Sequence, residues 1–252
     1  MGVWCLRSVI FSCFVSRFFS CDFHKIKFLE MNYEVIKSRH SVRSFTDAPI
    51  AADVKRLLDA AVARCNSDGG LSVKFVTEEP EAFGKSLLAR YGKFVNVRNY
   101  FCLIARRESG AEERVGRYGE MLVLKAQELG LNTCWVGMTF AKGRIPVEIA
   151  KDERLYAVIA VGYGQNQGAE HRVKTPDQIC REIAETPDWF RRGVDCALLA
   201  PTAVNQQKFR FKWLGGVSVS ASTGWGFFSK VDLGIAKLHF ELGASPVEVE
   251  WR

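Results

Sequence analysis

Hydrophobic and polar positions along the chain follow two different periods, which together predict a mixture of helices and strands. Apolar residues recurring every three or four positions predict helices at residues 33–39, 51–64, 81–91 and 112–129. Apolar runs rich in β-branched and aromatic residues predict strands at residues 72–77, 100–105, 133–138 and 155–162. A glycine-containing loop is expected at 66–70, and Gly130 is a typical residue to end the last helix. This pattern favours an α+β domain with its helices and sheet in three layers.

The last quarter of the chain resembles a shortened copy of an earlier part. Residues 126–136 align without a gap on residues 239–249, and each segment reads as a helix end, Glu-Leu-Gly, and then a strand. Earlier, Asp-Ala-Ala-Val before the strand at Lys74 resembles Asp-Cys-Ala-Leu before a strand near Lys208. Two copies are too few for a solenoid, so a fused pseudo-dimer is the natural interpretation. Chance similarity between common helix ends is the alternative.

The first thirty residues differ from the rest of the chain. An apolar, phenylalanine-rich stretch at 9–20 is interrupted by Arg17, has no Ala-x-Ala site after it and is too short to span a bilayer. A signal peptide or lipoprotein leader is one interpretation, and a start site placed upstream of Met31 is the one we prefer. The expected organisation is a segment outside the fold at 1–30, a first half at 31–176 and a shortened second half at 177–252.

Composition and charge argue against several classes of protein. The chain is 48% hydrophobic and 25% charged, as in folded globular proteins. Its net charge is +7, but Lys and Arg are scattered among acidic residues, so we expect no nucleic-acid partner. None of the eight cysteines forms a Cys-x-x-Cys pair, which argues against a metal site. Buried thiols in a reducing, cytoplasmic compartment are expected, with disulfides as the alternative, and no membrane association.

A cluster of cationic and hydroxyl side chains follows the first predicted helix. Arg39, Ser41 and Arg43 place two guanidinium groups and a hydroxyl within five residues, at the point where the helix gives way to a turn. Arginine offers planar, charged donors to phosphate oxygens and serine adds a neutral donor, so the cluster suits a phosphate. An ordinary polar turn is the alternative. His40 could suggest acid–base catalysis, but we expect it to orient its neighbours through its backbone.

Other chemical signatures are missing from the sequence. Gly162-x-Gly164 ends a strand without opening a helix, which argues against a dinucleotide-binding loop. The chain also contains no Ser-His-Asp pattern or P-loop, so hydrolase chemistry has no support.

The run from Arg39 to Phe45, R-H-S-V-R-S-F, resembles a signature of the nitroreductase family of FMN enzymes. That family continues with an A-P-S-x-x-N-x-Q loop that touches the flavin ring, and residues 64–70 do not fit it. Such a loop stands instead in the second half, as A-P-T-A-V-N-Q-Q at 200–207, while that half lacks the R-x-S-x-R motif. The resemblance covers about residues 32–252 and is closest to the tandem, single-chain (TM nitroreductase) branch of the family.

The resemblance implies one flavin site shared between the two halves. In homodimers of the family, the phosphate-binding arginines come from one subunit and the asparagine loop from its partner. A fused chain that keeps one motif in each half would form an intramolecular pseudo-dimer, as a monomer or a weak homo-oligomer. The cofactor-binding residues implied are Arg39, His40, Ser41, Arg43, Trp135, Val136, Gly137, Arg172, Lys174, Pro201, Thr202, Ala203, Asn205 and Gln207.

The activity implied is an FMN-dependent oxidoreductase. Electrons would pass from NADH or NADPH through flavin N5, beside the backbone of Gly137, to a small electrophilic acceptor such as a nitro compound or a quinone. No side chain or metal ion would be catalytic, and Lys93 or Arg98 would supply positive charge near the ring. A flavin-binding or flavin-handling protein without this turnover is the alternative, and an interaction module that has lost its cofactor is a third interpretation.

Overall fold

The structure is a computed structural model that describes residues 33–84 and 92–252. Contacts between residues divide the chain into a segment up to Asn32 and a unit from Tyr33 to Arg252, and only the second is described here. The interpretations of residues 1–30, and most of the helix expected at 81–91, therefore lie outside the described residues.

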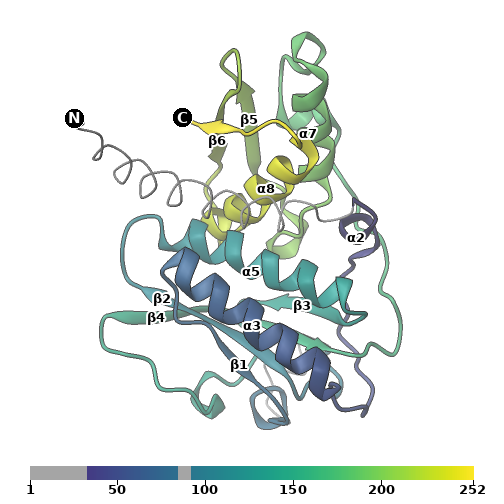
Figure 1. Ribbon diagram of the computed structural model, residues 1–252, viewed down its shortest axis with the longest axis vertical. Helices are drawn as coiled ribbons and strands as arrows, with labels where there is room; N and C mark the ends of the chain where they lie inside the picture. The colour runs from purple at the N-terminus through teal and green to yellow at the C-terminus, as the bar shows by residue number, and fades with distance from the viewer. Residues whose placement is uncertain (1–32, 85–91) are drawn as a thin grey trace, which may run out of the picture. The chain divides into compact units, whose positions relative to one another are not determined.

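The first half is built on a four-stranded antiparallel sheet (Figure 1). Its strands, in spatial order, are β1 (Lys74–Val76), β2 (Tyr100–Arg106), β4 (Glu153–Gly162) and β3 (Asn132–Val136). The two central strands, β2 and β4, are buried along almost their whole length. That burial on both faces explains why the sequence shows them as continuous apolar runs and not as alternating ones.

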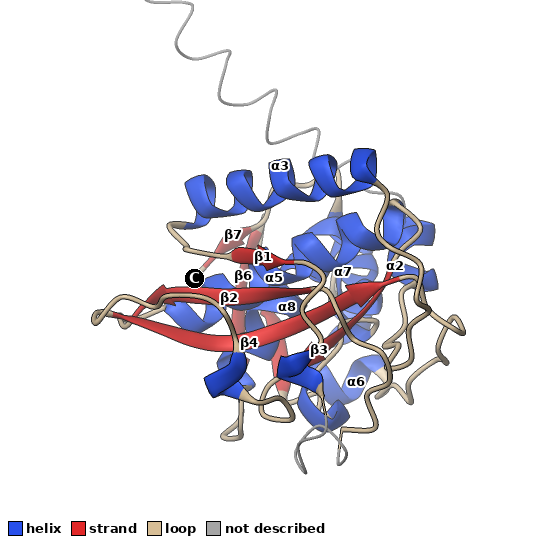
Figure 2. Cartoon of the chain, turned by 90° about the horizontal axis from the view of Figure 1, so that it is seen from below, coloured by secondary structure: helices blue, strands red, loops and turns tan. Residues whose placement is uncertain are grey.

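Two long helices pack on this sheet. Helix α5 (Ala111–Glu128) lies across β2, β3 and β4, and helix α3 (Ala52–Gly69) packs against α5 and β1 (Figure 2). Helix α2 (Tyr33–Ser38) precedes them and also contacts α5. Short 3-10 turns occur at Glu81–Phe83 and Lys142–Arg144.

The loop predicted at residues 66–70 is wrong, because α3 continues to Gly69. Cys65 and Gly69 are buried on the face of α3 that meets α5. A Cβ at Gly69 would lie 2.5 Å from the Tyr118 ring, so the glycine lets α3 approach α5 closely. The helix ends only at Gly70, whose φ of 59° is the left-handed conformation typical of a helix C-terminus. Packing therefore overrides the low helix propensity of Asn-Ser-Asp-Gly.

The second half has its own helices, sheet and core. Helices α7 (Asp188–Leu198) and α8 (Ser229–Ala244) pack closely on each other. Its sheet consists of β5 (Phe209–Trp213), β6 (Ser218–Thr223) and β7 (Glu250–Trp251), with β5 antiparallel and β7 parallel to β6. Phe240 forms the centre of the core, with ring centroids 4.7 Å from Phe211 and 5.1 Å from Phe190. Helix α6 (Pro176–Ile179) and a turn at Ile183–Glu185 connect the two halves.

The two Glu-Leu-Gly segments differ in structure. Gly130 lies just after α5 with a φ of 78°, as predicted for a helix end. Gly243 is the last residue but one of α8, so it too lies at a helix end, and a Cβ there would come within 2.5 Å of the Arg192 carbonyl oxygen of α7. The strand predicted directly after it is displaced to Glu250–Trp251, so the gapless alignment is wrong in this detail.

The halves meet where α5 crosses α8, and Figure 1 shows α5 between α3 and α8. A Cβ at Gly116 would lie 2.0 Å from the carbonyl oxygen of Val231, and one at Gly234 would lie 1.9 Å from that of Glu113. Gly116 thus contacts the residue three positions before Gly234, and Gly234 contacts the residue three positions before Gly116. A reciprocal contact of this kind is characteristic of interfaces with two-fold symmetry.

Cys65, Cys102, Cys134, Cys180 and Cys196 are buried and free, as predicted, whereas Cys5, Cys13 and Cys21 lie outside the described residues. Across residues 33–84 and 92–252, no helix is both long and apolar enough to cross a membrane. The same residues contain no cluster of three or more side chains suited to hold a metal ion.

Candidate functional site

The segment predicted to bind phosphate, residues 39–45, is called the arginine segment here. It runs along the edge of the first sheet, beside β3. Ser41 forms a parallel bridge with Thr133, and the Val42 amide donates to the Thr133 carbonyl at 2.9 Å. Further on, Phe45 forms an antiparallel bridge with Gly164, just after β4. These backbone contacts fix the segment as an additional edge of the sheet, so its side chains have defined positions relative to β3.

Arg39, Ser41 and Arg43 all act on the thiol of Cys134 in β3. Burial raises the pKa of the Cys134 thiol, while the Arg43 guanidinium, a hydrogen bond to Ser41 and the charge of Arg39 oppose that rise. Arg43 is exposed, Ser41 is partly buried and Arg39 is only 4% exposed. The structure therefore brings the three predicted donors together. His40 is partly buried, and its Cβ lies beside Gly168.

The loop with the asparagine motif, residues 201–207, has an unusual backbone. Val204, Asn205 and Gln207 have φ values of 45°, 55° and 44°, in the left-handed region that non-glycine residues rarely adopt. Val204 is also 96% exposed, so burial of its apolar side chain does not offset the strain. Such conformations persist where surrounding contacts over-determine them, and they cluster at ligand-binding sites.

Two predicted cations, Arg172 and Lys174, lie on the segment that holds this loop. Asn205 Nδ2 and Gln207 Nε2 both donate to the Arg172 carbonyl at 2.8 Å. Lys174 Nζ donates to the Gln207 carbonyl at 2.7 Å, and burial, followed by the charges of Arg210 and Lys208, lowers the Lys174 pKa. The Gln207 amide donates to Thr202 Oγ1 at 3.1 Å, so the hydroxyl at the family's serine position helps to close the loop. The structure thus joins the predicted basic pair directly to the asparagine loop.

Asp232 of α8 fastens the same loop from the other side, and sequence reasoning did not single it out. Its carboxylate accepts hydrogen bonds from the Ala203 amide at 3.0 Å and from Gln206 Nε2 at 2.7 Å. Burial raises the Asp232 pKa to about 6, although both hydrogen bonds oppose the rise. No motif signals this role, because the carboxylate lies 26 residues from its partner Gln206.

The raised pKa predicts a pH dependence of stability. Because the pKa is about 6 in the folded protein and 3.8 ordinarily, folding favours the protonated acid. That stabilisation is complete below about pH 4 and is lost as the pH rises through about 6. The quantity to follow is the free energy of unfolding of Asp232→Asn minus that of the wild type. Because only the wild type loses this stabilisation as the pH rises, the difference should increase by up to roughly 3 kcal/mol between pH 4 and pH 8. Urea unfolding at several pH values measures this, with Asp53→Asn at an exposed position of α3 as the control. Parallel curves for Asp232→Asn and the wild type would contradict the assignment.

The two halves meet beside predicted residues at two places. Arg39 Nη2 donates to the carbonyl of Leu199, two residues before Pro201, at 3.5 Å. At the end of β3, a Cβ on Gly137 would lie 2.5 Å from the ring of Phe228, which directly precedes α8. Phe228 follows the exposed aromatic residues Trp225 and Phe227, and the Phe227 carbonyl accepts a hydrogen bond from Gln206. The asparagine loop, this aromatic turn and Gly137 are therefore neighbours.

The other predicted ring-side residues use their side chains in packing. Trp135 packs against the core of the second half, and its Nε1 donates to Glu120 of α5 at 2.8 Å. Val136 is buried in the core of the first half. A ligand beside this part of β3 would meet mainly backbone and Gly137. Two cations were candidates for a place near the ring. Arg98 forms an ion pair with Glu78 at 3.6 Å. Lys93 is exposed and lies two residues before Val95, whose amide donates to the Arg43 carbonyl.

Comparison with known structures defines the fold as that of the nitroreductases. A structure from Thermotoga maritima MSB8, described as a "putative nitroreductase", matches with a TM-score of 0.58 and 22% identity over 84% of this chain and 82% of that one. A family model described as "Putative TM nitroreductase" matches residues 32–244, and the chain belongs to this family. The expected family and α+β nitroreductase-like fold are thereby confirmed.

Two further structures match a smaller part of the chain. An FMN-dependent nitroreductase from Clostridium difficile R20291 matches with a TM-score of 0.44 and 15% identity, over 61% of this chain and 96% of that one. A "putative nitroreductase" in complex with FMN from Desulfovibrio desulfuricans matches with a TM-score of 0.47 and 16% identity, over 61% and 95%. A search of the curated proteins found no match.

Proposed function

We propose that this chain binds a single FMN between its two halves and transfers electrons from NADH or NADPH to a small electrophilic acceptor, such as a nitro compound or a quinone. One observation carries the proposal. Arg39 of the arginine segment donates to Leu199, two residues before the strained asparagine loop of the second half, and Asn205 of that loop donates to Arg172 of the first half. Family membership makes FMN the cofactor to test.

The donors in this region suit the phosphate of FMN. Arg43 and Arg172 are exposed cations, and Ser41 adds a hydroxyl. Arg39 is buried, and within the described part of the chain its Nε has no hydrogen-bond partner, since the carboxyl oxygen of Glu120 lies 3.8 Å away. A buried guanidinium N–H without an acceptor is costly, and an anion nearby would offset that cost. We assign Arg39, Ser41, Arg43, Arg172 and Lys174 to the phosphate end, with His40 contributing through its backbone.

The end of β3 suits the flavin ring. Gly137 has no side chain, so a flat ring can approach its backbone, and the contact with Phe228 is already of this kind. Trp135 and Val136 would contribute their backbone, while Pro201, Thr202, Ala203, Asn205 and Gln207 would contact the ribityl chain or the ring from the second half. A cation at Lys93 or Arg98 would stabilise negative charge on the reduced ring.

When bound, FMN would supply the redox chemistry, and the chain would supply binding, orientation and electrostatics. The reciprocal contact of Gly116 and Gly234 supports an intramolecular pseudo-dimer, so one chain needs no partner subunit to complete the site. We therefore propose a monomer or a weak homo-oligomer, in the cytoplasm, with a small molecule as the electron acceptor.

Anaerobic mixing of the FMN-loaded protein with NADH or NADPH tests the activity. We expect rapid loss of the visible absorption of oxidised flavin with at least one of the two reductants, because the site has to admit the nicotinamide beside the ring. The absorption should return when a quinone or a nitro compound is then added. Flavin that stays oxidised with both reductants would instead favour a flavin-binding or flavin-handling protein, and a protein that takes up no FMN would overturn the proposal.

A further inference from the structure

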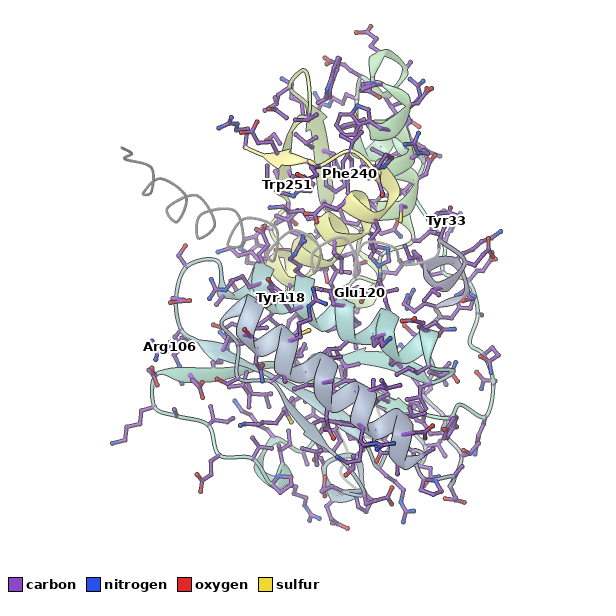
Figure 3. The ribbon with its side chains drawn as sticks, in the orientation of Figure 1. Tyr33, Arg106, Tyr118, Glu120, Phe240 and Trp251 are labelled. Atoms are coloured by element: carbon purple, nitrogen blue, oxygen red, sulfur yellow. The ribbon has the colours of Figure 1, made fainter. Side chains whose placement is uncertain are left out.

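A buried polar cluster lies between α5 and α8, next to the proposed site. Glu120 of α5 and His239 of α8 are both fully buried, and His239 Nε2 lies 3.0 Å from Glu120 Oε1. Figure 3 shows Glu120 on the stretch of α5 that faces α8. Trp135 Nε1 donates to the other oxygen, Oε2, at 2.8 Å, and Arg39 Nε lies 3.8 Å from Oε1. One carboxyl group therefore meets side chains from α8, from β3 and from the arginine segment.

The hydrogen bonds of His239 define the charge of this cluster. Its Nδ1 lies 3.3 Å from the Cys196 carbonyl oxygen, which can only accept, so Nδ1 carries a hydrogen. Its Nε2 faces a carboxyl oxygen, so one further proton lies between the two groups, on the imidazole or on the carboxyl. Both arrangements make the Glu120–His239 pair neutral. The pair therefore leaves the positive charge of Arg39 uncancelled.

We propose that Glu120, backed by His239, is a positioning residue that ties both ends of the flavin site together. Oε1 sets the position of the Arg39 guanidinium at the phosphate end, and Oε2 holds Trp135, two residues before Gly137 at the ring end. Because the pair is neutral, it orients Arg39 while leaving its charge available to a phosphate. This inference rests on the proposed function and adds residues to it that contact no flavin atom themselves.

Glutamine at position 120 separates orientation from charge. The Trp135 N–H needs an acceptor, so the amide oxygen of the variant would face Trp135 and the amide nitrogen would face His239 and Arg39. The pair stays neutral, but the Arg39 guanidinium now faces an amide N–H group where it faced a carboxyl oxygen 3.8 Å away, and it has to move. Glu120→Gln should therefore weaken the binding of the phosphate group and have little effect on the binding of the flavin ring.

The matched probes are FMN and riboflavin, which differ only in the phosphate. We expect Glu120→Gln to reduce the ratio of FMN affinity to riboflavin affinity by about tenfold or more, the change that corresponds to one lost hydrogen bond to a charged group. Glu241→Gln is the control, because Glu241 joins Arg117 of α5 at the same helix crossing, at 2.6 Å and 2.7 Å. It should lower thermal stability and leave the ratio unchanged.

His239→Gln provides a second route if Glu120→Gln does not fold. A glutamine here can still donate to Glu120 but cannot share a proton with it, so Glu120 stays anionic and cancels the charge of Arg39. The ratio should fall again. An unchanged ratio in both variants, or an equal fall in Glu241→Gln, would overturn the inference. Wild-type protein that binds neither flavin would instead overturn the proposed function. Wild-type protein that binds FMN and riboflavin equally would overturn the assignment of the arginine segment to the phosphate of FMN.

Discussion

Alanine at Gly116 or at Gly234 is expected to lower the free energy of unfolding by about 3 kcal/mol or more, at the upper end of what overpacking costs. The added Cβ would lie 2.0 Å from the Val231 carbonyl oxygen in one case and 1.9 Å from that of Glu113 in the other. A backbone carbonyl inside a helix cannot rotate away as a side chain can, so the helices would have to separate. Denaturant unfolding measures the loss.

The control for this prediction is Gly143→Ala. Within the described residues, a Cβ at Gly143 would have no neighbour within 4 Å, and its φ is not positive. The change should stay within about 0.5 kcal/mol. A double variant with alanine at both Gly116 and Gly234 should leave little folded protein, because domains of this size are stable by only about 5–15 kcal/mol. Equal stabilities of Gly116→Ala and Gly143→Ala would show that the crossing is not closely packed in solution.

Alanine at both Arg39 and Arg43 is expected to reduce FMN affinity about a hundredfold or more, because each arginine contributes at least one charge-assisted hydrogen bond of roughly 1.5–3 kcal/mol. Arg43→Ala alone should show part of this loss without destabilising the fold, since its side chain is exposed. Quenching of flavin fluorescence on titration with protein measures the affinity. Riboflavin binding should change much less.

The control is Arg56→Ala, which removes the same charge at an exposed position of α3, away from the proposed site. FMN affinity should stay within about twofold of the wild type at physiological salt, because distant surface charges are screened there. Full FMN occupancy in the double variant would show that the phosphate is held elsewhere. A loss shared equally by Arg56→Ala would mean that net charge, and not the arginine segment, attracts the cofactor.

The helices and strands that were predicted correctly are those whose own residues show a clear pattern of apolar positions. The buried strands β2 and β4 were expected from their apolar runs, and α5 from its periodicity and from Gly130. The end of α3 was mispredicted because the ring of Tyr118, far along the chain, decides whether Gly69 can be helical. The displaced strand β7 also depends on residues distant in the sequence, since it pairs in parallel with β6.

The same limit applies to the site. The motif residues Arg39, Ser41 and Arg43 could be found because they stand together in the sequence, and the structure brings them to β3. Glu120 and His239 could not be found in this way, since 119 positions separate them and His239 was noted only as the first residue of the repeated segment 239–249. A Glu directly before the apolar run 121–124 was the available signal, and without a visible partner it does not indicate a role.

The central claim is that the two halves of one chain hold a single FMN, and the flavin content of the reconstituted wild-type protein tests it most directly. After saturation with FMN and removal of the excess, denaturation should release one FMN per polypeptide. Arg43→Ala from the first half and Asn205→Ala from the second should each lower the occupancy of that same site. Release of two FMN per polypeptide, or retention of none, would contradict the account.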